Sequence, residues 1–408
     1  MQPASHAPRK ILYVENGIGY GGAVICLRHL VRNLDHSRYA AMVVTGRDGP
    51  LYADIANDAP WKPVIDRHLD VAGMRDRLDA ARWAKQIPGV HYILSQLIAR
   101  LDDVANLLPF LIGVLRVAKR YRPDLIHVNN EPLCNRGALL AAKLLGIPAV
   151  CHVRGDQEGS FAMRWFYRIP THFVPVSNWV SENIGRLGIP PERRTVVYDG
   201  LELGGLDVEA DGRGFRTKFN VPDKSFAVGL VGLLIPWKGQ RIFLDAARML
   251  RDRIPGLRML IVGGTPDECR GFEAELRRRV SDEALDDVVI FTGHVSNMPQ
   301  AYNGLDVVVS ASTSPEPLGT MVIESLAMAR PLVAPAHGGA AEMATHEKTA
   351  LLFNPGDAAD LAKQIARYYD EPETAQRLGK AARIHALATF DVETHARKIQ
   401  EVYDRLMR

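Results

Sequence analysis

The chain has 408 residues, with 50 Lys and Arg against 47 Asp and Glu, a formal net charge of +3 and 24% charged side chains. Its length exceeds what one hydrophobic core usually serves, so we expect two domains. The balanced charge gives no sign of nucleic-acid binding, and the four cysteines lack the spacing of a zinc site or a disulfide framework.

The first ten residues, MQPASHAPRK, are polar and lead directly into an apolar run. They lack the apolar core of a signal peptide, so we expect a loose tail. The scattered cysteines favour a reduced, cytoplasmic protein. The longest apolar passage, residues 104–118, contains Asn106, Pro109 and Arg116. A membrane span needs about 20 mostly apolar residues, so this passage is not predicted to be one.

The first half of the chain alternates short β-branched runs with helical periodicity. Apolar runs that end in glycine or polar residues occupy 10–17, 40–46, 124–130, 146–155 and 172–178. Amphipathic segments separate them, as at 19–34, 136–146 and 178–188. This alternation predicts a parallel sheet with helices on both faces.

The segment 72–122 departs from this alternation, because it is long, helix-prone and amphipathic. Basic residues interrupt its apolar positions: Arg75, Arg77, Arg82, Lys85, Arg100, Arg116, Lys119 and Arg120. One interpretation is a helical insert that packs on the N-terminal domain, which we favour. The alternative is a surface that rests on an anionic membrane or receives a lipid-linked acceptor.

The second half repeats the strand–helix alternation after a glycine-rich and charged connection at 201–224, where we expect a short helix. The segment 392–408 has the pattern of a terminal amphipathic helix. The predicted fold class is therefore α/β, with two doubly wound, Rossmann-like domains. We place the domains at 1–205 and 206–390, followed by a C-terminal helix at 391–408.

Two glutamates, Glu316 and Glu324, surround the expected start of a helix that follows the strand 306–312. Ligands of open parallel sheets bind beyond the carboxyl ends of the strands, and a helix start favours an anion. Gly319 would let a phosphate approach the backbone, and a carboxylate one turn into the helix can accept hydrogen bonds from a diol. Alternatively, the two acids are only solvated or complement the helix dipole.

Two further loops follow predicted strands. Lys238 and Gly239 precede a helix, where a lysine can contact a phosphate, although an exposed lysine at such a position is commoner. The backbone of His294 and Val295 could hold a base; the His294 side chain itself is not expected to be catalytic.

The ordered set of these motifs resembles the retaining glycosyltransferases of the GT-B fold, family 4. It comprises Lys238-Gly239, the loop VIFTGHVSNM, the glutamate pair and PLVAPAHGGAAEM, with GYGGAV and DLIHVNN upstream. The resemblance covers nearly the whole chain. It implies two Rossmann-like domains that face a central cleft and transfer a sugar from a nucleotide-sugar to an acceptor with retention of configuration.

The resemblance also implies roles for the C-terminal motifs. Glu316 would bind the hydroxyls of the donor sugar, and Glu324 would bind the ribose. Lys238 would neutralise the diphosphate. The backbone near Leu318, Gly319 and Thr320 would assist it, so no metal or other cofactor is expected.

In the N-terminal domain, the resemblance implies that the Gly21-Gly22 turn approaches the phosphates and that His152 lies near the reacting sugar, accompanied by Arg154. The alternative for the glycines is a turn that allows close packing. A lone histidine after a buried strand is often structural, which is the alternative for His152 and also for His127.

The sequence departs from the family pattern at two positions. Leu233 stands where an arginine usually contacts phosphate, so that contact is absent or comes from another residue such as Arg154 or Arg241. Ala329 stands where glycine commonly ends a helix, at a cost of about 1 kcal/mol if the site is left-handed.

The expected activity is a hexosyltransferase that uses a UDP- or GDP-sugar and a saccharide or lipid-linked acceptor in surface polysaccharide or glycolipid synthesis. Contact with the inner face of the plasma membrane would suit a lipid-linked acceptor. The rival functions are a nucleotide-sugar 2-epimerase, which needs no acceptor, and a catalytically degenerate binding protein.

Overall fold

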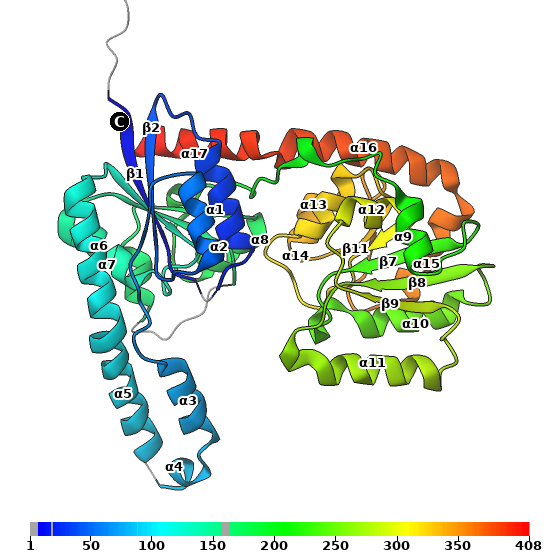
Figure 1. Cartoon of the computed structure of the whole chain (residues 1–408), viewed down its shortest axis with the longest axis horizontal. Helices are drawn as coiled ribbons and strands as arrows, with labels where there is room; N and C mark the ends of the chain where they lie inside the picture. The colour runs from blue at the N-terminus through cyan, green and yellow to red at the C-terminus, as the bar shows by residue number, and fades with distance from the viewer. Residues whose placement is uncertain (1–6, 18, 88, 157–162, 408) are drawn as a thin grey trace, which may run out of the picture. The chain divides into compact units, whose positions relative to one another are not determined.

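The structure is a computed structural model that describes residues 7–17, 19–87, 89–156 and 163–407 (Figure 1). The chain forms two compact units. Unit 1 runs to Val176 and also includes Val180–Gly200 and the end of the chain from His395; unit 2 comprises Ser177–Trp179 and Leu201–Thr394. The two units are described separately below.

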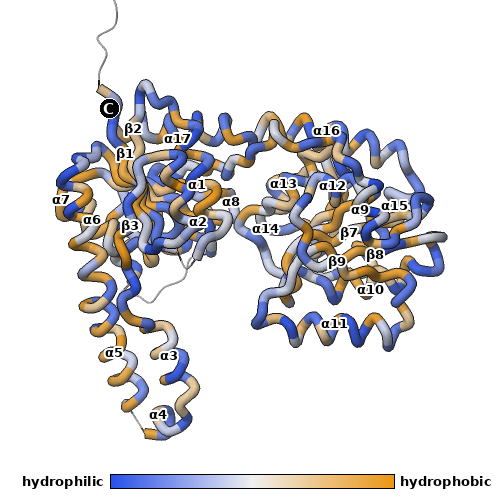
Figure 2. The backbone as a smooth tube through the Cα atoms, in the orientation of Figure 1, coloured by the Kyte–Doolittle hydropathy of each residue, from blue (hydrophilic) through white to orange (hydrophobic). Residues whose placement is uncertain are grey.

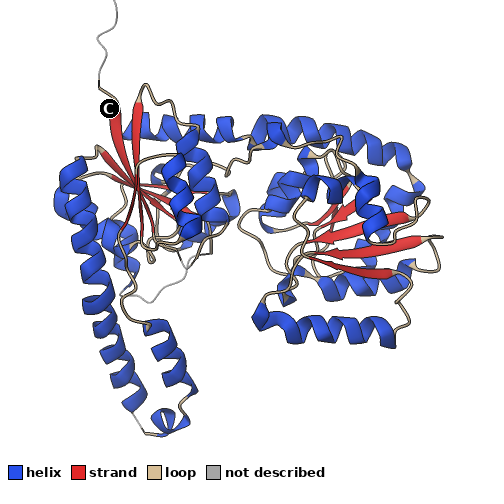
Figure 3. Ribbon diagram, viewed as in Figure 1, coloured by secondary structure: helices blue, strands red, loops and turns tan. Residues whose placement is uncertain are grey.

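Unit 1 contains a six-stranded sheet whose strands all run parallel (Figure 3). The spatial order is β3-β2-β1-β4-β5-β6, the order of a dinucleotide-binding fold. The strands are β1 (Arg9–Glu15), β2 (Tyr39–Thr45), β3 (Trp61–Pro63), β4 (Leu125–Asn129), β5 (Ala149–Val153) and β6 (His172–Pro175). Every residue of β4 and β5 is buried, as expected for central strands covered on both faces.

The polar N-terminal segment joins this sheet earlier than the sequence suggested. Arg9, which precedes the predicted strand at 10–17, pairs with Tyr39 of β2, and Lys10 pairs with Ala40. The backbone ladder of a parallel pair does not depend on the side chains that point outward, so two basic residues can begin the strand. Residues 1–6 of the expected tail lie outside the described part of the chain.

The helices of unit 1 follow the strands in sequence. They are α1 (Gly22–Arg32), α2 (Pro50–Ala53), α7 (Arg136–Leu145) and α8 (Asn178–Arg186). Between β3 and β4 lies the helical extension: α3 (Val71–Ala80), α4 (Arg82–Gln86), α5 (Val90–Asp102) and α6 (Leu108–Tyr121). A short π-helical turn, Asp103–Leu107, joins α5 to α6, so the two form one long helical run that projects beyond the sheet (Figure 1).

The last helix, α17 (Val392–Leu406), contributes to the core of unit 1. Ala396, Ile399, Val402 and Tyr403 belong to the same buried cluster as Ile11 of β1. The apolar face that the sequence predicted for this helix is therefore covered by the first unit, 190 or more residues away in the chain.

Unit 2 repeats the topology of unit 1, with the strand order β12-β11-β10-β7-β8-β9, all parallel. Its strands are β7 (Phe226–Val231), β8 (Leu257–Val262), β9 (Val289–Gly293), β10 (Val307–Val309), β11 (Leu332–Pro335) and β12 (Leu351–Phe353). The helices are α9 (Gly212–Lys218), α10 (Gln240–Leu250), α11 (Arg270–Asp282), α12 (Met298–Asn303), α13 (Thr320–Ala327), α14 (Gly338–Met343), α15 (Ala358–Asp370) and α16 (Pro372–Phe390). The predicted α/β class with two parallel sheets is confirmed.

The connection at 201–224 contains the expected short helix, α9, which packs on α12 of unit 2. A Cβ atom at Gly212 would lie 2.4 Å from the backbone of Asn303, so a side chain there would collide with α12. None of the helices in the described residues is long and apolar enough to cross a bilayer.

Candidate functional site

The candidate donor site lies in unit 2, where loops leave the carboxyl ends of β7 and β10. The first loop contains a short 3-10 turn, Pro236–Lys238, and the second runs from Ser310 to Gly319. Adjacent strands of a parallel sheet carry both loops to one edge. Residues 78 positions apart in the sequence can therefore meet there.

Lys238 and Glu316 form an ion pair at this edge, with 2.8 Å between Nζ and Oε1. Their side chains are 16% and 13% exposed, so the pair is shielded yet reachable. The Ser312 hydroxyl also donates to Glu316 Oε1. The Lys238 ammonium lies 4.5 Å from the centre of the Trp237 ring, an additional favourable contact for a cation. The sequence predicted both charged residues but not that they contact each other.

Gly239 is required next to Lys238 for two independent reasons. Its φ is +81°, in the left-handed region. A Cβ atom there would also lie 1.9 Å from the carbonyl oxygen of Ala311. The glycine thus allows the lysine loop to lie directly against the loop that carries Glu316, which fixes where the ammonium group points.

The motif PAHGG packs against the loop that carries Glu316. The backbone N–H of Gly339 donates to Glu316 O at 2.7 Å, and His337 Nε2 lies 3.0 Å from Ser312 O. Cβ atoms at Gly338 and Gly339 would approach the loop backbone to 2.8 Å. These two glycines therefore act in positioning the loop rather than in contacting a ligand.

The helix expected after the strand 306–312 is α13, which begins at Thr320 with Gly319 as its N-cap. Gly319 has no side chain to cap the free N–H groups, and the first turn contains no acidic residue. The positive end of the helix dipole is therefore uncompensated by this helix itself, which favours an anion. Thr320 is exposed, and Leu318 is half-buried beside it.

Glu324 lies one turn further along α13 and is held by Tyr302, whose hydroxyl donates to Oε2 at 2.7 Å. Burial raises the pKa of this carboxyl, and the hydrogen bond from Tyr302 opposes that shift. Among the described residues, Oε1 has no hydrogen-bond partner, so it can accept from a ligand hydroxyl. The sequence did not identify Tyr302, because nothing in its neighbourhood signals a partner 22 residues away.

A hollow of about 630 Å³ lies at the carboxyl ends of β8 and β9. Gly263, Thr265, Arg277 and His294 contribute to its lining, together with the ring of Phe291. His294 is exposed and Val295 is half-buried. A hollow lined by an aromatic ring and glycine backbone is suited to a planar base.

The position of the absent arginine, Leu233, is 51% exposed and follows β7. Arg241, one candidate to replace the arginine, makes two 2.8 Å hydrogen bonds with Glu275 and lies over the ring of Phe272. It is therefore engaged between α10 and α11. The side chain of Leu233 itself offers no charge to a phosphate.

In unit 1, His152 lies on β5 with no exposed surface. Its neighbours are Arg154, Asp199, His127 and His395, with 3.4 Å between His152 Nε2 and Asp199 Oδ1. Burial, followed by the Arg154 charge, lowers the pKa of His152 well below its usual value. The ring is thus a neutral member of a buried polar cluster, and its role near a sugar stays a prediction.

Arg154 is fixed in the same cluster. Its Nε and Nη2 donate to Asp199 at 2.8 and 2.9 Å, and its Nη1 donates to Asn129. The side chain is 8% exposed. A guanidinium that is paired and buried in this way stabilises unit 1, and a phosphate would have to compete with Asp199 for it.

The glycines at the start of α1 have no structural reason to be glycine. Gly21 is extended, with φ −160°, a conformation open to any residue. Cβ atoms at Gly21 and Gly22 would meet nothing within 4 Å, and both positions are exposed. Close packing, the alternative explanation, therefore does not explain why these two residues are glycine. A ligand that approaches the backbone would explain them.

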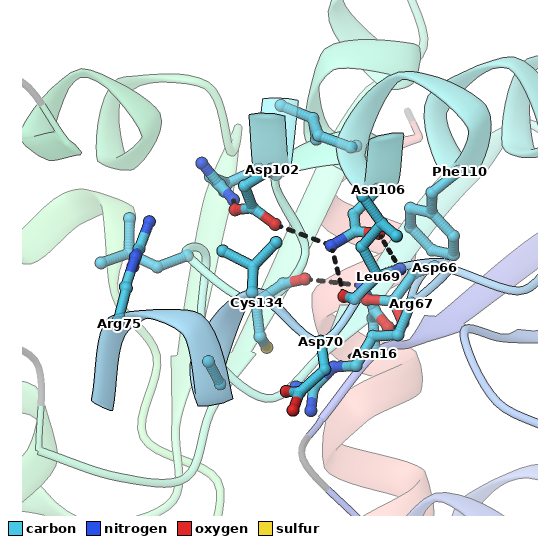
Figure 4. Close-up of a pocket in the computed structure, with 16 residues that line it drawn as sticks. Asn16, Asp66, Arg67, Leu69, Asp70, Arg75, Asp102, Asn106, Phe110 and Cys134 are labelled. Atoms are coloured by element: carbon cyan, nitrogen blue, oxygen red, sulfur yellow. Dashed lines mark hydrogen bonds and ion pairs between the residues drawn. The ribbon is translucent and has the colours of Figure 1, made fainter. Parts of the chain in front are cut away.

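A second candidate site is a pocket of about 210 Å³ in unit 1, beyond the carboxyl ends of β1 and β3 and under the helical extension (Figure 4). Asn16 and Asp66 each have a buried Oδ1 atom without a hydrogen-bond partner. Burial raises the pKa of Asp66. Arg67 and Arg75 contribute positive charge to the lining. This site has no local sequence signal, because its residues are contributed by segments far apart in the chain.

Asn106 organises the wall of this pocket between α5 and α6. Its side-chain amide accepts from the backbone of His68 and Leu69 and donates to Leu69 O and to Asp102 (Figure 4). Asp102 in turn pairs with Arg136 at 3.1 Å. Asn106 is therefore fully hydrogen-bonded, whereas Asn16 Oδ1 and Asp66 Oδ1 have no hydrogen-bond partner, although Arg67 lies 4.0 Å from Asp66.

Two family models match the chain in succession. Residues 20–204 match the family described as Glycosyltransferase Family 4, and residues 213–385 match Glycosyl transferases group 1. No group of three or more His, Cys, Asp or Glu in the described ranges is arranged to hold a metal ion.

Several curated relatives are similar over part of the chain. The D-inositol 3-phosphate glycosyltransferase of Pseudarthrobacter chlorophenolicus is 34% identical over 46% of this chain and 46% of its own length. The putative glycosyltransferase YtcC of Bacillus subtilis is 27% identical over 70% and 73%. The lipopolysaccharide core mannosyltransferase LpsB of Rhizobium meliloti is 30% identical over 46% and 53%. The match thus spans about half the length of two of these relatives.

Solved structures share the fold over nearly the whole chain. Anabaena Alr3699/HepE in complex with UDP superposes with a TM-score of 0.80 and 23% identity, over 97% of this chain and all of that one. A glycosyltransferase from Rickettsia africae gives a TM-score of 0.82 with 18% identity, over 99% of this chain and all of that one. From these matches and the paired Rossmann-like sheets, the chain belongs to the GT-B glycosyltransferases of family 4, group 1.

Proposed function

We propose that the chain transfers a sugar, with retention of configuration, from a nucleotide-diphosphate sugar to a saccharide or lipid-linked acceptor. The observation that carries the proposal is the Lys238–Glu316 pair placed directly before the uncapped start of α13. It joins a cation and free N–H groups, which suit a diphosphate, to a carboxylate, which suits sugar hydroxyls.

Each group of donor-site residues binds the part of the donor that suits its chemistry. The Lys238 ammonium and the N–H groups near Leu318, Gly319 and Thr320 bind the diphosphate. This binding releases Glu316 from its ion pair to accept hydrogen bonds from the sugar. Glu324 accepts from the ribose through Oε1, while Tyr302 holds its other oxygen. The hollow beside His294 takes the base.

The acceptor is held in the polar pocket of unit 1, where Asn16 Oδ1 and Asp66 Oδ1 lack a hydrogen-bond partner. Saccharide hydroxyls are donors that satisfy such groups. A pocket of about 210 Å³ suits one sugar ring rather than a long chain.

In the reaction, the bond between the anomeric carbon and the phosphate oxygen breaks, and a bond to the acceptor oxygen forms on the same face. The acceptor proton passes to the leaving phosphate oxygen. The negative charge that develops on the diphosphate is stabilised by Lys238 and the α13 N-terminus. No protein nucleophile and no metal ion are required for this sequence of events.

The first test is thermal unfolding with UDP, GDP, ADP and their sugar conjugates, in chelator and in magnesium. A ligand at 100 times its dissociation constant adds about 2.7 kcal/mol of stability. We expect one nucleotide to shift the transition equally in both buffers and the shift to disappear in Glu324→Ala. Glu373→Ala, an exposed acid on α16, is the matched control and should behave as wild type.

The second test is turnover with product analysis. Lys238→Ala and Glu324→Ala should lower the rate by orders of magnitude, whereas Lys363→Ala, on the exposed face of α15, should not. Unchanged rates in both donor-site variants would refute the assignment. If the donor is epimerised in the absence of an acceptor, the chain is a nucleotide-sugar 2-epimerase instead. If the nucleotide binds but no product forms, the chain is a binding protein.

A further inference from the structure

The helical extension of unit 1 exposes an apolar stripe along its long helical run. Six aliphatic side chains, each between 38% and 64% exposed, form it: Ile93, Leu97, Leu101, Val104, Leu108 and Ile112. Their spacing of three and four residues keeps them on one face of the helix. In α6 the opposite face, with Phe110 and Val114, is buried, whereas no residue of α5 is buried. The stripe extends roughly 28 Å at 1.5 Å per residue.

Helix α4 and the start of α5 lie at the end of the extension that is farthest from the sheet (Figure 2), and each contains an exposed aromatic residue. Trp83 of α4 is 58% exposed, and Tyr92 of α5 is 69% exposed. Ile87, between them, is 51% exposed. So many exposed aliphatic and aromatic residues within one extension are uncommon on the surface of a monomer and indicate an interaction surface.

The charges around the stripe are predominantly basic. Residues 71–122 contain nine Lys and Arg against four Asp and no Glu, although the whole chain carries only +3. Three of the four acids are engaged: Asp79 lies 2.8 Å from His91, Asp102 pairs with Arg136, and Asp103 pairs with Arg100. Basic residues flank both ends of the stripe, with Arg82 and Lys85 at one end and Arg116, Lys119 and Arg120 at the other.

This charge pattern disfavours a second copy of the chain as the occupant. In an antiparallel pair, Arg82 and Lys85 of one copy would meet Arg116 and Lys119 of the other. In a parallel pair, each basic residue would meet its own equivalent. Both arrangements place like charges opposite one another without acids to compensate, so the surface is complementary to an anionic partner.

We propose that the apolar stripe and its basic ends dock on an anionic lipid surface. The aliphatic side chains insert among the acyl chains at the interface, and Trp83 and Tyr92 lie at headgroup depth, where amphipathic rings are favoured. Arg82, Lys85, Arg116, Lys119 and Arg120 contact the anionic headgroups. This surface is separate from the donor-site residues, and the inference stands whether or not the proposed reaction is correct.

The test is sedimentation of the full chain with vesicles of phosphatidylcholine alone and of phosphatidylcholine mixed equally with phosphatidylglycerol. The chain is expected to sediment with the mixed vesicles, and to be released by high salt, because exposed charges are screened. The double variant Leu97→Gln/Val104→Gln and the triple variant Arg116→Ala/Lys119→Ala/Arg120→Ala should each bind at least tenfold more weakly.

The matched control is Leu144→Gln/Ile384→Gln, which removes two aliphatic side chains that are 67% and 73% exposed outside the extension. It should bind vesicles as wild type does. Failure of the wild type to sediment with the mixed vesicles would overturn the proposal, as would equal binding by the stripe variant and this control. A dimer in solution that the stripe variant dissociates, without vesicle binding, would identify a second copy as the occupant instead.

Discussion

Ala329 is a residue whose backbone conformation conflicts with its side chain. It follows α13 with φ +55°, and the N–H groups of Ala329 and Arg330 donate to Leu326 O and Ser325 O, both at 3.0 Å. This is the Schellman arrangement, which favours glycine at the left-handed position. Ala329→Gly should therefore stabilise unit 2 by about 1 kcal/mol, measured by chemical or thermal unfolding.

The same substitution elsewhere provides the control. Ala381→Gly, in the middle of α16, should destabilise by about 1 kcal/mol, because glycine is a poor helix former. Ala284, with φ +51° after α11, should respond as Ala329 does. If Ala→Gly changes the stability equally at positions 329 and 381, then Ala329 is not strained by its left-handed backbone conformation.

Glu324 is a half-buried carboxylate, and its charge should lower the free energy of unfolding of the ligand-free protein. Its pKa is raised by burial, so the folded state holds a proton to higher pH than the unfolded state does. Stability therefore falls as the pH rises through the interval from the unfolded to the folded pKa. Glu324→Gln should raise the melting temperature at neutral pH, where the cost is complete, and have no such effect below the ordinary pKa range of Glu.

The binding arm of that experiment uses the same variant. Glu324→Gln should weaken binding of the nucleotide while it raises stability, because a neutral amide is a weaker acceptor than a carboxylate. A variant that is less stable at neutral pH would contradict the burial argument. Unchanged nucleotide affinity would contradict only the role in binding.

At the scale of elements, the loop that carries Glu316 depends on the two glycines that begin α14. Gly339→Ala would place a Cβ atom 2.8 Å from Leu318 Cα and 3.0 Å from Pro317 O. The loop must move by several tenths of an ångström, which should weaken donor binding at least tenfold without unfolding the sheet. Isothermal titration with the nucleotide that stabilises the wild type measures the change.

Gly271→Ala is the matched control, since a Cβ atom there meets nothing within 4 Å and lies in the first turn of α11. It should bind the nucleotide normally and be slightly more stable. If Gly339→Ala also binds normally, then the loop tolerates the shift and PAHGG is not a positioning motif.

At the scale of the whole molecule, the end of the chain completes the first unit. Ile399, Val402 and Tyr403 are buried in the core of unit 1, and the Tyr403 hydroxyl contacts His127 Nδ1 at 2.6 Å and Tyr13 Oη at 3.0 Å. Truncation after Thr394 removes these groups and leaves His127 unpaired in the interior. Each large apolar side chain that is removed contributes about 1.5–3 kcal/mol of stability through its burial. Unit 1 should therefore lose its cooperative fold when several of them are deleted together.

Hydrogen exchange of the truncated chain measures this outcome unit by unit. Amides of β1 and β4 should lose protection, whereas those of β7 and β8 should keep it. Tyr92→Phe in the full chain alters an exposed ring, so the protection of these amides is expected to stay unchanged. Retained protection in β1 and β4 would show that unit 1 folds without α17.

The sequence by itself determined the elements that depend on local pattern. The buried strands, the α/β class and the start of α13 follow from β-branched runs, from strand–helix alternation and from the glycine at 319, because these signals act over a few residues. Lys238, Glu316 and Glu324 could be selected as candidates in the same way, since each follows a predicted strand at the edge where ligands of parallel sheets bind.

The tertiary structure decided what depends on residues distant in the chain. It paired Lys238 with Glu316 and gave Glu324 its partner Tyr302. It also buried His152 beside Arg154, Asp199 and His395. It also placed Asn16 beside Asp66 and left the stripe from Ile93 to Ile112 exposed. Burial and partners arise only when the sheet brings separate segments together, so no local pattern can specify them.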